Sequence, residues 1–156
     1  MTSFPVTPEG RDKLKEELAR LKTERPKISK EIGAAIEMGD LSENFEYHSA
    51  KDRQGMIEAH IRDIEGKLAR IEVIDPSTLS GDRVVFGATV VLADTDTDEE
   101  KTYQIVGEPE ADATKGRISI QSPIARALLR KEVGDEVKVP GKDGPRTVEI
   151  IDIRFE

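Results

Sequence analysis

Apolar residues recur at a heptad period on both sides of one short polar stretch, and this pattern limits the folds open to the chain. In the first arm, from Thr7 to about Glu37, the seam positions step by four and three: Leu14, Leu18, Leu21, Arg25, Ile28, Ile32 and Ala35. In the second arm, from Tyr47 to about Asp75, the same spacing gives Tyr47, Ala50, Gln54, Ile57, Ile61, Ile64, Leu68 and Ile71. Such seams are typical of paired coiled-coil helices. Matched arms joined by a short turn must pair antiparallel, so we predict a helical hairpin in which Leu14–Leu21 faces Leu68–Ile71.

Local signals support a helix over the first arm. Thr7 is a good N-cap, and Pro8 suits the first helical position, where its missing N–H costs nothing. We expect Pro26 to bend this helix near Thr23 without dividing it, because the seam keeps its register across the proline. Arms of about 30 residues at about 1.5 Å per residue give a finger of roughly 45 Å.

The periodicity changes after Asp75-Pro76, where proline and small polar residues predict a linker. Beyond it we predict one antiparallel sheet and one short helix, so that the fold class is α+β. The predicted strands are residues 83–86, 88–92, 102–106, 117–120, 137–139 and 147–153, and the helix is 124–129. The predicted domains are therefore residues 1–76, an N-terminal coiled-coil finger, and residues 80–156, a small C-terminal sheet domain.

Composition narrows the class of protein. Aromatic residues make up 4% and charged residues 36%, which is typical of a chain with much coiled coil. The absence of cysteine excludes disulfides and thiolate metal sites. The chain begins Met1-Thr2-Ser3-Phe4 without a basic, apolar leader, and no apolar run approaches a membrane span, so we expect a soluble cytoplasmic protein with no membrane partner.

The charge balance argues against direct binding of nucleic acid. Residues 1–75 hold 13 Lys and Arg against 16 Asp and Glu, and residues 76–156 hold 11 against 16. Neither half has the basic excess of a protein that binds nucleic acid by neutralising phosphates. If the chain acts on nucleic acid, something else must hold it.

The turn between the arms carries paired acids. Asp40 and Glu43 are three residues apart, after Gly39, and in a first helical turn such positions point the same way. Two carboxylates can share a divalent cation, although Mg²⁺ prefers six oxygens and the other ligands would come from a partner. The alternative is helix capping, with Asp40 or Ser42 as the N-cap of the second arm and Glu43 or Glu46 near the helix dipole. Spacing alone favours capping.

Other polar residues near the turn have ordinary interpretations. Tyr47 lies on the seam and is expected to pack, and His48 has no nucleophile placed beside it. Lys51 and Arg53, the cations nearest the turn, are expected to be solvated unless a phosphate or an acidic partner meets them. The acidic stretch 94–100 lacks the glycine and the closing glutamate of a calcium loop, so we predict a solvated hairpin turn there.

The turn also carries a family resemblance. Residues 39–48 (GDLSENFEYH) and 51–55 (KDRQG) closely resemble the finger tip of bacterial transcript-cleavage factors of the GreA/GreB family. The resemblance extends to four further segments: residues 7–10 with Leu14, 24–26, 122–129 and 148–153. It covers nearly the whole chain, and the GreA branch is the closer match because GreB-type proteins have a more basic finger face.

The resemblance implies a partner and a mechanism. An FKBP-like C-terminal domain would dock on bacterial RNA polymerase, with the region 122–129 as a first guess for the contact, and the finger would enter the secondary channel. Asp40 and Glu43 would help to hold a second Mg²⁺, jointly with the polymerase, so that the polymerase cuts its backtracked nascent RNA near the 3′ end. Ser42, Asn44, Tyr47, Lys51 and Arg53 are the further residues expected to contact the polymerase or RNA. The protein would be a monomeric activator and not itself an enzyme.

One departure and two alternatives accompany this resemblance. The family commonly has a basic residue four positions before the tip aspartate, where this chain has Ile36. That change predicts weaker cleavage or greater dependence on Lys51 and Arg53. The first alternative is a channel-binding inhibitor without cleavage activity, although the Asp-Leu-x-Glu-Asn pattern is intact. The second is a prolyl isomerase or a coiled-coil adaptor; the few aromatic residues of the second half disfavour the isomerase.

Overall fold

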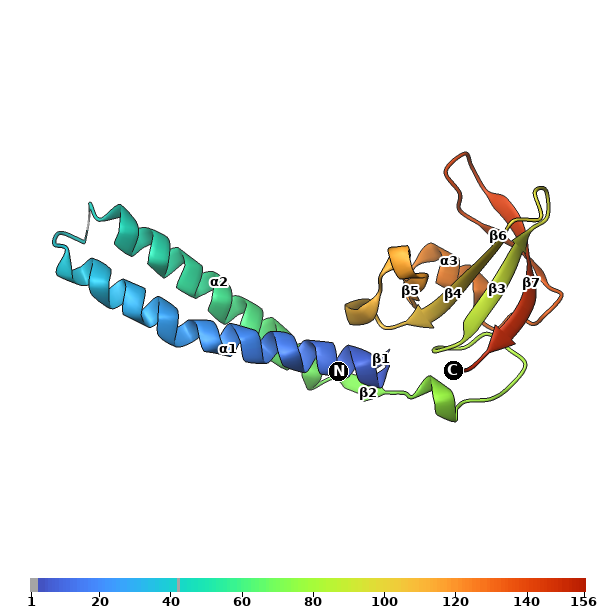
Figure 1. The fold of residues 1–156 in the computed structure, drawn as a ribbon, viewed down its shortest axis with the longest axis horizontal. Helices are drawn as coiled ribbons and strands as arrows, with labels where there is room; N and C mark the ends of the chain where they lie inside the picture. Colours follow the sequence, from blue (N-terminus) through green and yellow to red (C-terminus); the bar gives the residue numbers. More distant parts are fainter. Residues whose placement is uncertain (1–2, 42) are drawn as a thin grey trace. The chain divides into compact units, whose positions relative to one another are not determined.

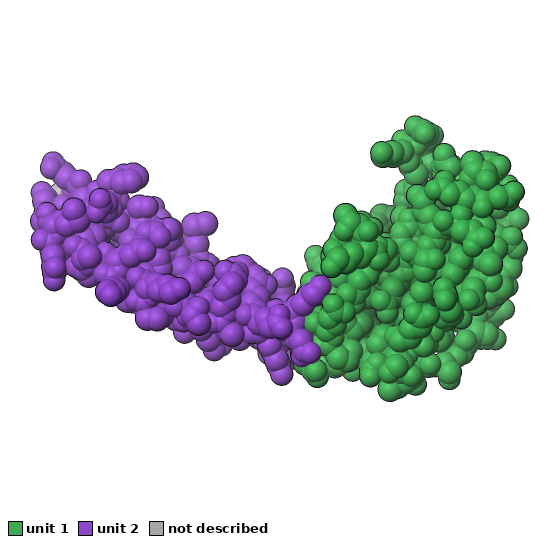
Figure 2. Space-filling view, viewed as in Figure 1, with its two compact units in different colours: residues 1–11, 71–156 green, residues 12–70 purple. Residues whose placement is uncertain are grey.

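The computed structural model describes residues 3–41 and 43–156, and it divides into two compact units (Figure 1 and Figure 2). Residues 12–70 form one unit. Residues 1–11 and 71–156 form the other, so the chain of the second unit is interrupted by the first.

Two long helices form the unit of residues 12–70. Helix α1 is Pro8–Glu37, and helix α2 is Phe45–Leu68, antiparallel to it (Figure 1). The predicted seam is confirmed, since its apolar positions are buried or half-buried on both helices. Helix α1 continues through Pro26, as predicted. In the ranges that the structure describes, no helix has both the length and the apolar character needed to cross a membrane.

The polar interruption of the seam is an interhelical ion pair. The Arg25 guanidinium donates to both carboxylate oxygens of Glu58 on α2, from Nε and Nη2, each at 2.7 Å. This hydrogen bond lowers the pKa of Glu58 and raises that of Arg25. The bidentate geometry fixes a relative register of the two helices at a position where the seam has no apolar side chain.

The predicted extent of the second arm is wrong at its C-terminal end. Helix α2 ends at Leu68, and Ile71–Val73 forms strand β2, which pairs in parallel with strand β1, Phe4–Val6. Ile71 therefore lies opposite Phe4 and does not extend the seam against Leu14. The reason is the run Ile-Glu-Val-Ile, whose β-branched residues suit a strand once a partner strand is available.

The larger unit contains a five-stranded sheet with the order β5-β4-β3-β7-β6. Its strands are β3 (Thr89–Asp94), β4 (Glu100–Val106), β5 (Arg117–Ser119), β6 (Glu136–Val139) and β7 (Arg146–Arg154). The sheet is mixed and not purely antiparallel as predicted, because β5 pairs in parallel with β4. The segment between them, with 3₁₀ turns η2 (Glu108–Glu110) and η3 (Ala113–Lys115), carries the chain back along β4 before β5 begins.

A second correction concerns residues 83–86, which form no strand. Arg83 makes only an isolated bridge to Glu132. Val84 bonds instead to the segment after the short helix, donating to Lys131 O and accepting from Arg130 N. Val84 is buried in the core, and Gly87 has φ +88°, so the segment turns into the domain before β3 begins.

The predicted short helix is present as α3, Pro123–Leu128, with Ser122 as its N-cap accepting from Ala125 N at 3.2 Å. Its buried residues Ala125 and Leu128 join one apolar core with residues of the sheet. The core residues are Val84, Ala88, Val90, Leu92, Ile105, Ile118, Val137, Val139, Val148 and Ile150. The α+β class, a helical hairpin followed by a sheet domain, is thus confirmed.

A buried carboxylate holds the first turn of α1 within the larger unit. Glu110 is 1% exposed and accepts from Thr7 N (3.0 Å), Thr7 Oγ1 (2.5 Å) and Gly107 N (2.9 Å). Thr7 caps α1 as predicted, since its Oγ1 accepts from Gly10 N at 3.2 Å. We call this arrangement of Thr7, Gly107 and Glu110 the Glu110 clasp.

Candidate functional site

The paired acids lie in the loop that joins the two helices of the hairpin (Figure 1). The last turn of α1 closes with Met38 N donating to Ala35 O and Gly39 N donating to Ile36 O. Gly39 then takes φ +120°, a left-handed conformation that glycine adopts without a Cβ clash. The predicted tight turn at Gly39 is therefore present.

Asn44 sets where the second helix begins. Its side-chain oxygen accepts from Tyr47 N at 3.0 Å, which caps α2, and its side-chain amide donates to Ala35 O at 2.7 Å. One side chain thus joins the start of α2 to the last turn of α1. The cap is therefore Asn44 and not Asp40, which precedes it by four residues. The alternative cap Ser42 lies outside the described residues.

Asp40 and Glu43 precede the helix and do not occupy its first turn as expected. Both are exposed, and Glu43 N donates to Asp40 O at 3.4 Å, so a turn brings their backbones together in place of a helical face. Across residues 3–41 and 43–156, no three His, Cys, Asp or Glu side chains gather closely enough to hold a metal ion. Two carboxylates supply hard oxygen ligands for part of a Mg²⁺ shell.

The cations behind the loop are exposed and have partners on the finger itself. Lys51 Nζ donates to Gln54 Oε1 at 3.2 Å, one turn further along α2. Arg53 donates from Nη2 to the carboxylate of Glu31 on α1. An exposed pair of this kind is worth about 0–1 kcal/mol, so Arg53 can exchange it for another anion at small cost.

Tyr47 and His48 follow the cap. Tyr47 is half-buried, in keeping with its seam position, and its ring meets His48 edge to face with centroids 5.3 Å apart. The His48 residue is exposed. Neither arrangement places a described nucleophile beside the imidazole, so among the described residues of the tip the two carboxylates are the candidate functional groups.

The structure shows an exposed apolar surface beside Asp40 and Glu43 that was not predicted from the sequence. Phe45 is 82% exposed and Met38 is 68% exposed, and both line a shallow hollow whose other apolar residues include Ala34 and Ala35. Ile36, in the last turn of α1, is 49% exposed. The available signal was that Met38 and Phe45 fall off the heptad seam, which leaves their side chains without a place between the helices.

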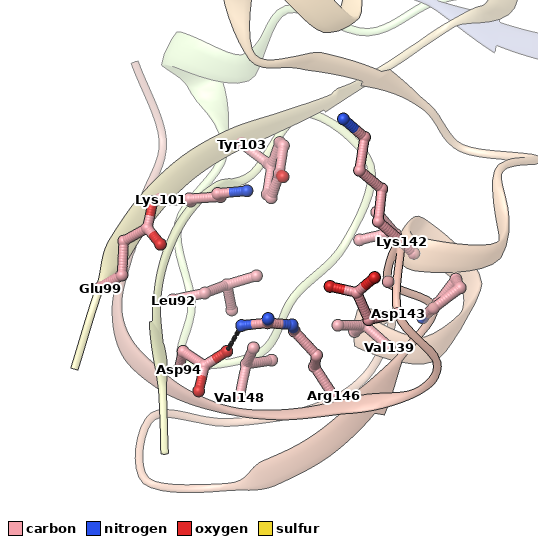
Figure 3. Close-up of a pocket in the computed structure, with 13 residues that line it drawn as sticks. Leu92, Asp94, Glu99, Lys101, Tyr103, Val139, Lys142, Asp143, Arg146 and Val148 are labelled. Carbon is pink, nitrogen blue, oxygen red and sulfur yellow. Dashed lines mark hydrogen bonds and ion pairs between the residues drawn. The ribbon is translucent and has the colours of Figure 1, made fainter. Parts of the chain in front are cut away.

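The sheet unit has its own pocket, of about 290 Å³ (Figure 3). Strands β3 and β4 line it together with the turn between β6 and β7, and Lys101 and Lys142 reach toward it from opposite sides. Tyr103 is the one aromatic residue among those lining it, which is a poor match to the aromatic-lined site that a prolyl isomerase needs. Of the segment 122–129, Ile124 lines this pocket.

One wall of the pocket is an ion pair. Arg146 Nη1 donates to Asp94 Oδ2 at 2.8 Å, and the other oxygen of Asp94 accepts from Asp96 N and Thr97 N. These hydrogen bonds, that of Arg146 foremost, hold the pKa of Asp94 below its usual value. The acidic stretch is thus a hairpin turn, as predicted, with Asp94 ordering it from the end of β3.

Comparison with known proteins shows matches over nearly the whole chain. A family model described as "Transcription elongation factor, N-terminal" matches residues 4–73, and one described as "Transcription elongation factor, GreA/GreB, C-term" matches residues 79–155. Proteins named transcription elongation factor GreA from Brucella anthropi and from Brucella abortus strain S19 are each 55% identical over 156 residues, covering 99% of both chains.

A solved structure is also similar in sequence. GreA factor homolog 1 (Gfh1) of Thermus thermophilus is 27% identical, covering 97% of this chain and 99% of that one, with a TM-score of 0.44. At a TM-score below 0.5, the likeness adds nothing to what the sequence matches indicate.

Proposed function

Because the chain belongs to the GreA/GreB family of transcription elongation factors, we propose that it binds RNA polymerase and stimulates the polymerase's cleavage of backtracked nascent RNA. The finger enters the secondary channel and brings Asp40 and Glu43 to the active centre. The observation that carries this proposal is the placing of two exposed carboxylates in one turn at the far end of a hairpin.

The carboxylates act by completing a metal site. Two acids fill at most part of the six-oxygen shell that Mg²⁺ prefers, so the polymerase supplies the other ligands. A second Mg²⁺ held in part by Asp40 and Glu43 would supply an activated water and positive charge near the scissile phosphate. Asp40 and Glu43 hold that position and orient the attacking water. The protein is then an activator of the polymerase, since neither acid completes a site alone.

Two features of the chain support a mechanism in which the polymerase binds the RNA and this protein supplies the two carboxylates. The net negative charge of each half leaves RNA binding to the polymerase. In the described part of the hairpin, the apolar seam residues of each helix are buried or half-buried, so we propose that the protein acts as a monomer. The C-terminal unit docks on the polymerase, and the protein works in the cytoplasm with it.

The deciding experiment is a cleavage assay on a stalled, backtracked elongation complex. The variant Asp40→Ala/Glu43→Ala should lose stimulated cleavage while its affinity for polymerase stays close to that of the unsubstituted protein. Asp52→Ala is the matched control, because it removes an exposed acid from α2 outside the loop. Undiminished cleavage by the double variant would refute the proposal.

A second candidate function shares the fold and partner but has the opposite effect. Ile36 puts an exposed apolar side chain where the family commonly has a basic one, which favours a channel-binding inhibitor without cleavage activity. The same assay separates the two, because an inhibitor slows elongation and leaves backtracked RNA uncut.

A further inference from the structure

Phe45 is the exception among the aromatic residues. The chain has four Phe, two Tyr and no Trp, and all six aromatic residues lie in the described ranges. Five of them are buried or half-buried, whereas Phe45 is 82% exposed, the highest value among the exposed large apolar side chains described. An exposed phenyl ring forgoes about 1.5–3 kcal/mol of stabilisation that burial would supply, so a partner that covers the ring would bind favourably.

The backbone that carries this ring is fixed. Phe45 is the first residue of α2, directly after Asn44, whose side chain bonds to both helices. The ring and Met38 line the same hollow beside Ala34. We call these three residues the tip shelf. It presents a small apolar face, prearranged by the Asn44 hydrogen bonds and not by contacts of the ring itself.

The tip shelf lies next to the proposed reaction centre. Phe45 is two residues from Glu43, so their Cα atoms are at most about 7 Å apart. A phosphodiester attacked at a metal that Glu43 helps to hold has its own nucleotides within reach of the ring. In backtracked RNA the nucleotides on the 3′ side of that phosphate are extruded from the hybrid, and their bases are unpaired.

We propose that Phe45 stacks on an unpaired base of the backtracked RNA beside the scissile phosphate and positions the strand for cleavage. This inference rests on the proposed function. Single-stranded RNA is commonly held by bases stacked on exposed aromatic side chains, because every base offers a flat π-face. Residues 37–46 contain four acids and no Lys or Arg, and the one cation among the described residues lining the hollow, Arg53, is paired with Glu31. The segment therefore repels phosphate, and the ring offers the RNA a face for a base.

The same charges favour a base over an apolar pocket of the polymerase. Glu43 and Glu46 flank Phe45 and are exposed. Burying the ring in a protein pocket would desolvate these carboxylates, which is costly without a paired cation. A stacked base covers one face of the ring, leaves Glu46 in water and leaves Glu43 available to the metal.

Substitutions at Phe45 test the stacking. With saturating protein, Phe45→Ala should slow stimulated cleavage by about 5- to 150-fold, the range of alanine substitutions at stacking aromatics. Phe45→Trp should keep most of the rate, and Phe45→Leu should behave like Ala because it keeps apolar bulk without a π-face. Met56→Ala is the control, since Met56 is 71% exposed on the same helix and lies off the tip shelf. Thermal unfolding should not change in any variant.

Backtracked RNA with an abasic nucleotide on the 3′ side of the scissile phosphate identifies the partner of the ring. Each cleavage rate is divided by the rate without the protein. On abasic RNA, the relative rate with the unsubstituted protein should fall to that of Phe45→Ala. The relative rate with Phe45→Ala should be the same on abasic and on ordinary RNA. An equal loss for Phe45→Ala on both RNAs would overturn the inference and assign the ring to a polymerase contact. Full activity of Phe45→Ala would also overturn it and leave the proposed function intact, whereas absence of stimulation by the unsubstituted protein would overturn both.

Discussion

The Glu110 clasp makes a quantitative prediction. In Glu110→Ala, two backbone N–H groups and one hydroxyl lose their acceptor in a site that is 1% exposed. Each unsatisfied buried donor costs about 1–3 kcal/mol, and water entering the vacated space recovers part of this, so we expect a loss of roughly 3–5 kcal/mol. A domain of this size has about 5–15 kcal/mol of stability, so the variant should be marginal.

Glu110→Gln should cost much less. Oε1 accepts from both backbone amides, Thr7 N and Gly107 N, and a glutamine oxygen keeps both bonds. Only the acceptor for the Thr7 hydroxyl is replaced by a donor, and that hydroxyl can turn to accept. We therefore expect a loss of about 1–2 kcal/mol for Gln.

Hydrogen exchange measures both losses where they occur. The amides of the non-proline residues in 4–7 and 107–110 should exchange faster in the order unsubstituted, Gln, Ala, while amides inside α2 keep their protection. Glu108→Ala is the control, because Glu108 is exposed in the same 3₁₀ turn. If Ala and Gln cost the same, or if Ala costs less than about 1 kcal/mol, the clasp is not the hydrogen-bonded anchor described.

Three further outcomes follow from the contacts. Asn44→Ala should lower hairpin stability by about 1 kcal/mol through loss of the cap, measured by thermal unfolding of helix circular dichroism; an unchanged melting temperature would contradict the role of Asn44. Arg25→Leu should raise the melting temperature of the hairpin and reduce the salt dependence of its stability, since an apolar seam residue replaces an exposed pair with Glu58; a lower melting temperature would mean that the ion pair contributes more than the apolar contact. The hydrogen bond from Arg146 lowers the pKa of Asp94 in the folded protein. The stabilisation of the fold by this bond is therefore complete above the ordinary Asp pKa of about 3.9, and it disappears as the pH falls through the lowered pKa. Between about pH 5 and pH 2, the free energy of unfolding in urea should therefore fall less for Asp94→Asn than for the unsubstituted protein. Equal falls would rule out this role of the Asp94 carboxylate.

The hairpin was predictable because its information is local and repeated. Each heptad position specifies the same seam, and Leu14, Leu21, Ile61 and Ile64 are all buried there. The end of the second arm was not predictable in the same way. Ile71 fits both the seam and a strand, and the choice depends on Phe4, a partner far away in sequence.

The tip shows the same limit at smaller scale. The position of Asp40 and Glu43 at the apex follows from the arms on either side. The helix boundary does not, because serine, aspartate and asparagine all cap well and only the bond from Asn44 to Ala35 O decides among them. The burial of Glu110 could not be predicted from the sequence, because a glutamate among many acidic residues is expected at the surface unless its hydrogen-bond donors are known.

The hydrogen bond between Thr7 and Glu110 has a consequence for folding during biosynthesis. Thr7 leaves the ribosome early, yet its acceptor Glu110 follows 103 residues later, which at about 5–20 residues per second is a wait of roughly 5–20 s. Residues 12–70 form their contacts among themselves and can pair during this interval, whereas the larger unit closes only when both of its segments are present. A fragment of residues 80–156 would lack β1, β2 and Thr7, and would leave the Glu110 carboxylate facing an unfilled site.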